Sequence, residues 1–169
     1  MLILGIDPGS YNTGYGIVEV DGGRVVHREH GVIEVSKGLE FSARLQLIGE
    51  KIQALMANWT PHVTVVEKIF LGRNADSAFK LGHVRGVLLL EALRVKSEIC
   101  EYTPREVKKG ITGSGAAEKE QVQMILFSIL GIRAPAKVDA SDALALAYYH
   151  AVQMEVAKRM KKSLRESSL

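Results

Sequence analysis

The chain has 169 residues, of which 47% are hydrophobic and 24% charged, with a formal net charge of +3, as for one globular domain with one core. Cys100 is the single cysteine, which excludes an intrachain disulfide and a cysteine metal site. Because no apolar run approaches the roughly 20 residues that cross a bilayer and no signal peptide is evident, we expect a soluble protein of the reducing cytoplasm.

The N-terminal part of the chain has the pattern of an antiparallel meander. Residues 2–6 are predicted to form a buried strand, and the turn-forming stretch PGSYNTG follows Asp7. A second strand is expected at 15–20. The sequence Asp21-Gly22-Gly23 then indicates a hairpin, because glycine readily takes the positive φ of tight turns, so a third strand is expected from about Arg24.

The rest of the chain alternates between helical and strand patterns. From residue 40 to 59 apolar side chains recur at steps of four and three, which indicates an amphipathic helix that Pro61 ends. The pattern then predicts a strand at 62–66, a helix at 75–94, a strand at 97–102, a short helix opened by Pro104, a helix at 116–130 after a Gly-Ser-Gly break, and a last helix from about 138 through the tail.

This order of elements predicts an α/β fold with a mixed sheet flanked by helices. The first three strands would be antiparallel, and the later strands would join through parallel βα crossovers. We expect one domain over residues 1–155 and a basic C-terminal tail over residues 156–169.

Four carboxylates occupy positions at which such a fold gathers functional groups. Asp7 and Glu67 each close a strand, and ligand groups in open α/β sheets gather at the carboxyl edge of the strands. Asp139 and Asp142 share a helix face because they are three residues apart, and alanines around them would let that helix approach the sheet closely. Each acid has an ordinary alternative role as a helix cap, an ion-pair partner or a turn residue. Together they predict a divalent-metal site, since four unpaired carboxylates are too costly to bury without a cation.

Positive charge is concentrated away from these acids. Three segments are basic, at residues 68–85, 105–119 and 153–169, and the remainder of the chain is acidic. A metal centre flanked by phosphate-binding surfaces has this separation of charge. Solvated helix faces are the alternative explanation, above all for the C-terminal segment.

Four motifs in chain order resemble the RuvC family of Holliday-junction resolvases over nearly the full length: ILGIDPGSYNTGYG, VEKIFLGRNADSAFKLGHVRG, TPREVKKGITGSGAAEKEQVQ and DASDALALAYYH. The resemblance implies an RNase H-like fold and a homodimer, for which the apolar helix at 75–94 is the expected interface. It also implies symmetric nicking of two like-polarity strands of a four-way DNA junction, and a partnership with the RuvA-RuvB branch-migration complex.

In this family the catalytic acids correspond to Asp7, Glu67, Asp139 and Asp142. They would bind Mg²⁺, two ions per subunit, with Mn²⁺ as a substitute, for in-line attack of water on a phosphodiester. Four further residues are expected to contact DNA. Lys108 and Lys119 would hold phosphate near the cleaved strand, and Phe70 would stack on an unpaired base beside Arg73.

Three other functions are compatible with parts of the sequence. The stretch DPGSYNTGYG also resembles the first phosphate loop of actin-like ATPases, although those proteins need a duplicated domain to enclose the nucleotide. A junction-binding module without catalytic activity is a second alternative. A third is another nuclease of the RNase H-like fold, for example one that acts on RNA–DNA hybrids.

Overall fold

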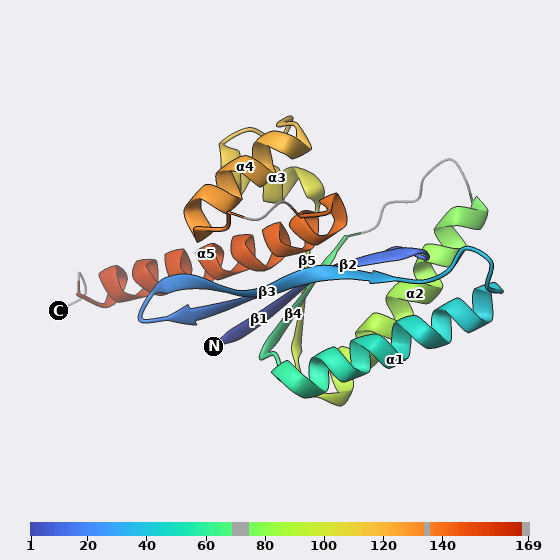
Figure 1. Cartoon of the computed structure of the whole chain (residues 1–169). Coiled ribbons are helices and arrows are strands. Elements are labelled where there is room, and N and C mark those ends of the chain that lie inside the picture. Colours follow the sequence, from blue (N-terminus) through green and yellow to red (C-terminus); the bar gives the residue numbers. More distant parts are fainter. Residues whose placement is uncertain (69–74, 134–135, 167–169) are drawn as a thin grey trace.

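A five-stranded mixed sheet forms the centre of the molecule, with helices on both faces. The computed structural model describes residues 1–68, 75–133 and 136–166. Helices α1 and α2 cover one face of the sheet, whereas α3, α4 and α5 lie on the other (Figure 1). The strands are β1 (Leu2–Asp7), β2 (Asn12–Asp21), β3 (Arg24–Glu34), β4 (Val63–Glu67) and β5 (Glu98–Tyr102), and the helices are α1 (Phe41–Trp59), α2 (Ala75–Arg94), α3 (Pro104–Thr112), α4 (Lys119–Leu130) and α5 (Val138–Glu166).

The strand order β3-β2-β1-β4-β5 confirms the predicted topology. The pairs β1–β2 and β2–β3 are antiparallel, whereas β1–β4 and β4–β5 are parallel. In the β2–β3 ladder Ile17 pairs with Glu29 and Val18 pairs with His27, so Arg28 is the extra residue of a β-bulge. Strand β1 is central, so its carboxyl end lies between the antiparallel strand β2 and the parallel strand β4.

Side chains of the central strands alternate between two hydrophobic cores, one on each face of the sheet, rather than the single core expected from the sequence. Ile3 packs into the core beneath α3, α4 and α5, whereas Leu4 and Ile6 pack into the core beneath α1 and α2. This period of two is the normal consequence of a pleated strand that is buried on both faces. By the same alternation, Asp7 lies on the α5 face of the sheet.

The predicted elements agree with the structure apart from a few ends. Strand β2 begins at Asn12, three residues earlier than expected, and α4 begins at Lys119 rather than at residue 116. Just before α4, the Ala117 carbonyl accepts a hydrogen bond from the Lys108 Nζ at 2.7 Å. Helix α1 ends at Trp59 as expected, and Thr60 before Pro61 takes the left-handed conformation.

Helix α5 runs without interruption from the sheet into the basic tail. The helix passes through residue 155 without a break. The division between a domain at residues 1–155 and a basic tail at residues 156–169 therefore rests on composition alone and stays a prediction. In the described part of the chain, no helix is sufficiently long and apolar to cross a membrane.

Candidate active site

Asp7 and Glu67 lie side by side at the carboxyl ends of two parallel strands. The β1–β4 register pairs Ile6 with Val66, so the next residue on each strand is one of these acids. Val63 and Val65 pack into the α5-side core, which places Glu67 on the same face as Asp7. The predicted positions of both acids at strand ends are therefore confirmed.

Helix α5 brings Asp139 and Asp142 to this edge because its backbone lies almost against the strands. A Cβ atom at Gly14 would overlap the carbonyl of Asp139, and one at Gly5 would overlap the carbonyl of Ala143. The helix contributes small residues of its own, since Ala140 and Ala143 are fully buried. The alanine contribution was predicted. The glycines were not, although glycine inside an otherwise apolar strand is a known sign of close backbone approach.

This close packing predicts a large effect of one methyl group. Gly14→Ala should displace the start of α5 and destabilise the fold by about 1–3 kcal/mol, because the added carbon meets backbone rather than a flexible side chain. Urea unfolding would measure the loss. Gly38→Ala, in the exposed turn before α1 where the nearest atom to an added Cβ is Ser36 Oγ at 3.8 Å, is the matched control and should not destabilise the protein. Equal stability of both variants would contradict this account of the packing.

The four carboxylates are close enough to perturb one another. Burial raises the pKa of Asp7 to about 7, with further contributions from the negative charges of Glu67, Asp142 and Asp139. The pKa of Glu67 is also raised, first by burial and then by Asp142. Lys119 opposes both shifts. The structure therefore brings all four predicted acids into one electrostatic cluster.

Lys119 and Lys108 lie beside this cluster on α4 and α3. The Lys119 ammonium donates to Asp142 Oδ2, forming an ion pair. The Lys108 ammonium instead donates to the Ala117 carbonyl, two residues before Lys119. Both lysines, with Glu67 and Asp142, line a cavity of about 200 Å³. Each predicted lysine thus reaches the acidic site, while phosphate contact stays a prediction.

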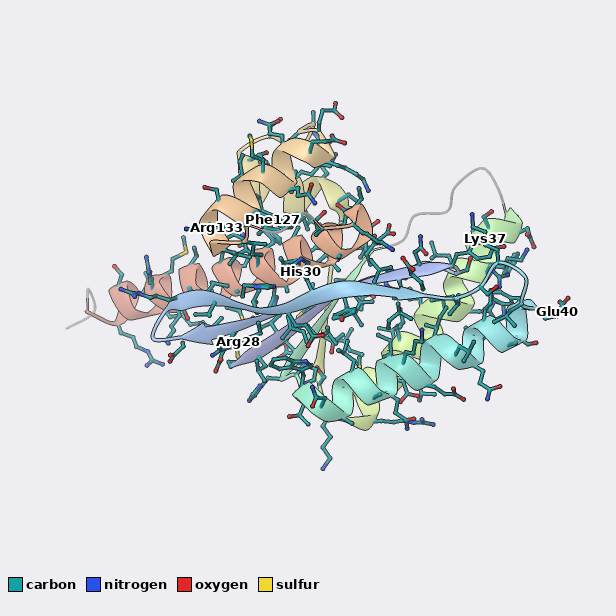
Figure 2. All side chains as sticks on the ribbon, viewed as in Figure 1. Arg28, His30, Lys37, Glu40, Phe127 and Arg133 are labelled. Carbon is teal, nitrogen blue, oxygen red and sulfur yellow. The ribbon has the colours of Figure 1, made fainter. Side chains whose placement is uncertain are left out.

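Contacts from β3 and α2 hold α4 and the end of β4 in place around the site. Figure 2 shows His30 of β3 next to Phe127 of α4, and their ring centroids are 5.7 Å apart, which holds α4 over the sheet. On the other side, Arg85 of α2 donates to the backbone carbonyl of Glu67 at 2.6 Å and pairs with Glu101. Arg85 was expected only as part of a basic segment. Its role in holding Glu67 depends on a contact across 18 residues that no local pattern reveals.

The donor set suits a hard divalent cation. All four acidic side chains offer oxygen, the ligand that Mg²⁺ and related ions prefer, and Lys119 is the cation that offsets their repulsion of Asp7. Within residues 1–68, 75–133 and 136–166, no three acidic, histidine or cysteine side chains are arranged around a single point as metal ligands. One of the four acids, Asp142, is instead paired with Lys119.

Two of the predicted DNA-contacting residues, Phe70 and Arg73, lie outside the described residues. Their roles stay predictions.

Comparison with known proteins agrees with this geometry. A solved structure of Thermus thermophilus RuvC in complex with a Holliday junction substrate matches 93% of this chain and 96% of its own with a TM-score of 0.85 and 29% identity. The yeast mitochondrial Holliday junction resolvase Ydc2 matches with a TM-score of 0.70 at 15% identity, which bears on the fold alone. The fold is therefore RNase H-like, as expected. Together with the acidic site, it defines the protein as a nuclease of the RNase H-like fold.

Sequence comparison is more specific. The model of the family "Crossover junction endodeoxyribonuclease RuvC" matches residues 3–150. RuvC of Bdellovibrio bacteriovorus is 47% identical over 164 residues, covering 97% of this chain and 98% of the relative, and RuvC of Geobacter sulfurreducens is 42% identical over 165 residues, covering 98% and 100%. The chain belongs to the RuvC family of crossover junction endodeoxyribonucleases.

Proposed function

We propose that this protein resolves four-way DNA junctions by paired, Mg²⁺-dependent hydrolytic nicks in two strands of like polarity. The observation that carries the proposal is the convergence of Asp7, Glu67, Asp139 and Asp142 from β1, β4 and α5. Cleavage of this kind serves homologous recombination and DNA repair. The family membership supports the substrate class, and the acidic cluster supports the chemistry.

The four acids would bind the metal ions and set the negative electrostatic potential of the site. Divalent cations held by these carboxylates would activate water as the nucleophile and neutralise charge that develops on the phosphate. Asp7, between β2 and β4 at the centre of the cluster, is the residue best placed to serve more than one ion. Glu67, Asp139 and Asp142 complete the oxygen donors around it. Mg²⁺ is the ion that best fits a site completed by substrate phosphate, and Mn²⁺ should substitute for it.

The lysines supply positive charge on the α3–α4 side of the acids. Lys119, more than half exposed, can reach a phosphate bound at the mouth of the cavity. Lys108 holds the chain that leads into α4, so its effect on phosphate would be exerted both directly and through the position of Lys119.

One gel assay tests the proposed function. Labelled four-way junction, linear duplex and RNA–DNA hybrid are incubated with the protein in Mg²⁺, in Mn²⁺ and in EDTA. We expect symmetric nicks in the junction with either ion and none in EDTA. Preferred cleavage of the hybrid would overturn the choice of substrate, and junction binding without cleavage in either ion would favour a binding module.

A homodimer through α2 is the proposed assembly, and its exposed face supports this. Phe79, Leu90 and Leu93 are 70%, 49% and 60% exposed, an unusual extent for large apolar side chains along one helix. Between Phe79 and Leu90, a Cβ at Gly82 or Gly86 would meet nothing within 4 Å, so a second helix could approach closely there. Two copies related by a twofold axis would present two active sites to two equivalent strands.

Gly86→Glu tests the dimer without disturbing the monomer. The position is exposed and open, so the side chain should fit, but two buried carboxylates would face each other across a twofold interface. We expect a monomer in sedimentation at micromolar concentration, an unchanged fold by circular dichroism, and loss of paired nicking. Ala54→Glu, on the exposed side of α1, is the charge-matched control and should remain dimeric. Paired nicking by a monomeric Gly86→Glu variant would refute the role of the dimer.

The partnership with RuvA-RuvB and the location in the cytoplasm are proposed on family membership alone. Co-sedimentation of this protein with a junction-bound RuvA-RuvB complex would test the first.

A further inference from the structure

Lys119 has an unusual position for a cation on a helix. It is the first residue of α4, where the aligned peptide dipoles favour negative charge, and the flanking residues Glu118 and Glu120 follow that preference. The helix therefore does not account for a lysine here. Its ammonium instead crosses to Asp142 on α5, 23 residues later in the chain.

The two partners of this ion pair differ in their access to solvent. The Lys119 side chain is 55% exposed and the Asp142 side chain 22%, so the lysine can withdraw toward solvent while the aspartate stays in the site. The adjoining cavity of about 200 Å³ gives the lysine side chain room to move. The chain before it is held in place, because Lys108 donates to the Ala117 carbonyl. Movement of Lys119 thus requires only rotations of its own side chain.

We propose that Lys119 is an exchangeable counter-ion of the acidic site: it competes with divalent cations for Asp142 and, once displaced, offers its ammonium to substrate phosphate. The inference rests on the proposed function, since it takes the four acids as the metal site. Asp142 Oδ2 accepts the lysine, and a metal ion at that carboxylate would meet a positive charge at close range. Lys119 would therefore lower the affinity of the site for metal while keeping the carboxylates together when metal is scarce.

This competition makes metal binding and phosphate binding mutually dependent. A lysine released from Asp142 is available to DNA, so metal should strengthen junction binding, and linkage requires DNA to strengthen metal binding by the same factor. A lysine that only stabilised the fold would produce no such coupling.

Mg²⁺ titration without DNA tests the proposal apart from catalysis. Isothermal titration calorimetry would compare wild type with Lys119→Gln, Lys119→Arg and the exposed-residue control Lys109→Gln. We expect Lys119→Gln to bind Mg²⁺ about five- to tenfold more tightly, within the usual range of coupling between sites. Lys119→Arg, which keeps the charge and can hold the carboxylate, should bind no more tightly than wild type. Lys109→Gln should match wild type.

Thermal melts in EDTA and in Mg²⁺ give a second readout. Lys119→Gln should melt below wild type in EDTA and show a larger upward shift on addition of Mg²⁺, whereas a purely structural loss would lower both melts equally. Unchanged or weaker Mg²⁺ binding by Lys119→Gln, or tightening that Lys109→Gln reproduces, would overturn the competition. Absence of both Mg²⁺ and Mn²⁺ binding by the wild-type protein, free and with junction DNA, would instead overturn the metal site of the proposed function, so the two failures are distinguishable.

Discussion

Asp7→Asn should reduce single-turnover cleavage of a four-way junction to below about 1% of wild type while leaving junction binding unchanged or slightly tighter. The loss corresponds to roughly 3 kcal/mol or more in the activation barrier, as expected when a metal ligand shared within an acidic cluster becomes neutral. Asparagine keeps the size of the side chain, so the packing around the end of β1 should survive. Removal of a negative charge that faces DNA phosphate should assist binding.

Two measurements separate these effects. Cleavage is followed with enzyme in excess over labelled junction in Mg²⁺, and binding is measured by gel shift in EDTA. Asp21→Asn, at the exposed end of β2, makes the same chemical change at the opposite end of the sheet from the acids and should leave both unaffected. Residual cleavage well above 1% by Asp7→Asn would contradict its role as a metal ligand.

The expected loss exceeds that for the other acids because of the position of Asp7. It lies on the central strand β1, and its pKa is affected by all three other acids, whereas that of Glu67 is raised by burial and by Asp142. A carboxylate that interacts electrostatically with all three of the others is the hardest to replace by a neighbour.

Sequence patterns predicted the sheet and the acids because both depend on local signals. Apolar runs ending in Asp7 and Glu67 indicate strands and their carboxyl ends, and the i, i+3 spacing of Asp139 and Asp142 indicates a shared helix face. Pro104 was expected to open a short helix, and Thr103 and Glu106 indeed form a capping box around it. In each case the residues that carry the signal are near neighbours in the chain.

The contacts that refine the site were not predictable in this way. Arg85 reaches the Glu67 carbonyl from another element, and Lys108 donates one hydrogen bond to the Ala117 carbonyl. A charge count treats both residues as available cations. Only the folded chain shows that both side chains donate to backbone carbonyls, and that the charge of Arg85 is also paired with Glu101.

The raised pKa of Asp7 predicts that, in EDTA, its contribution to the stability of the fold falls as the pH rises. An exposed aspartate has a pKa of 3.8, whereas Asp7 in the folded protein has a pKa of about 7. Between these values the folded protein keeps a proton that the unfolded chain releases. The stabilisation from protonated Asp7 is therefore complete below about pH 4 and is lost as the pH rises to about 7, by up to roughly 4 kcal/mol.

Asp7→Asn should remove this dependence, because its amide does not titrate. At pH 8 in EDTA the variant should be more stable than wild type by a few kcal/mol, whereas at pH 4 the two should be similar. Urea unfolding at pH 4, 6 and 8 measures the difference, with Asp21→Asn as the control for loss of an exposed carboxylate. Addition of Mg²⁺ at pH 8 should narrow or reverse the gap, since only the wild type retains the full set of acids and gains stability from the bound ion. A constant difference in stability between Asp7→Asn and wild type across these pH values would show that the pKa of Asp7 is not raised in the folded protein. The acidic cluster would then be solvated, rather than held together by the packing of α5 on the sheet.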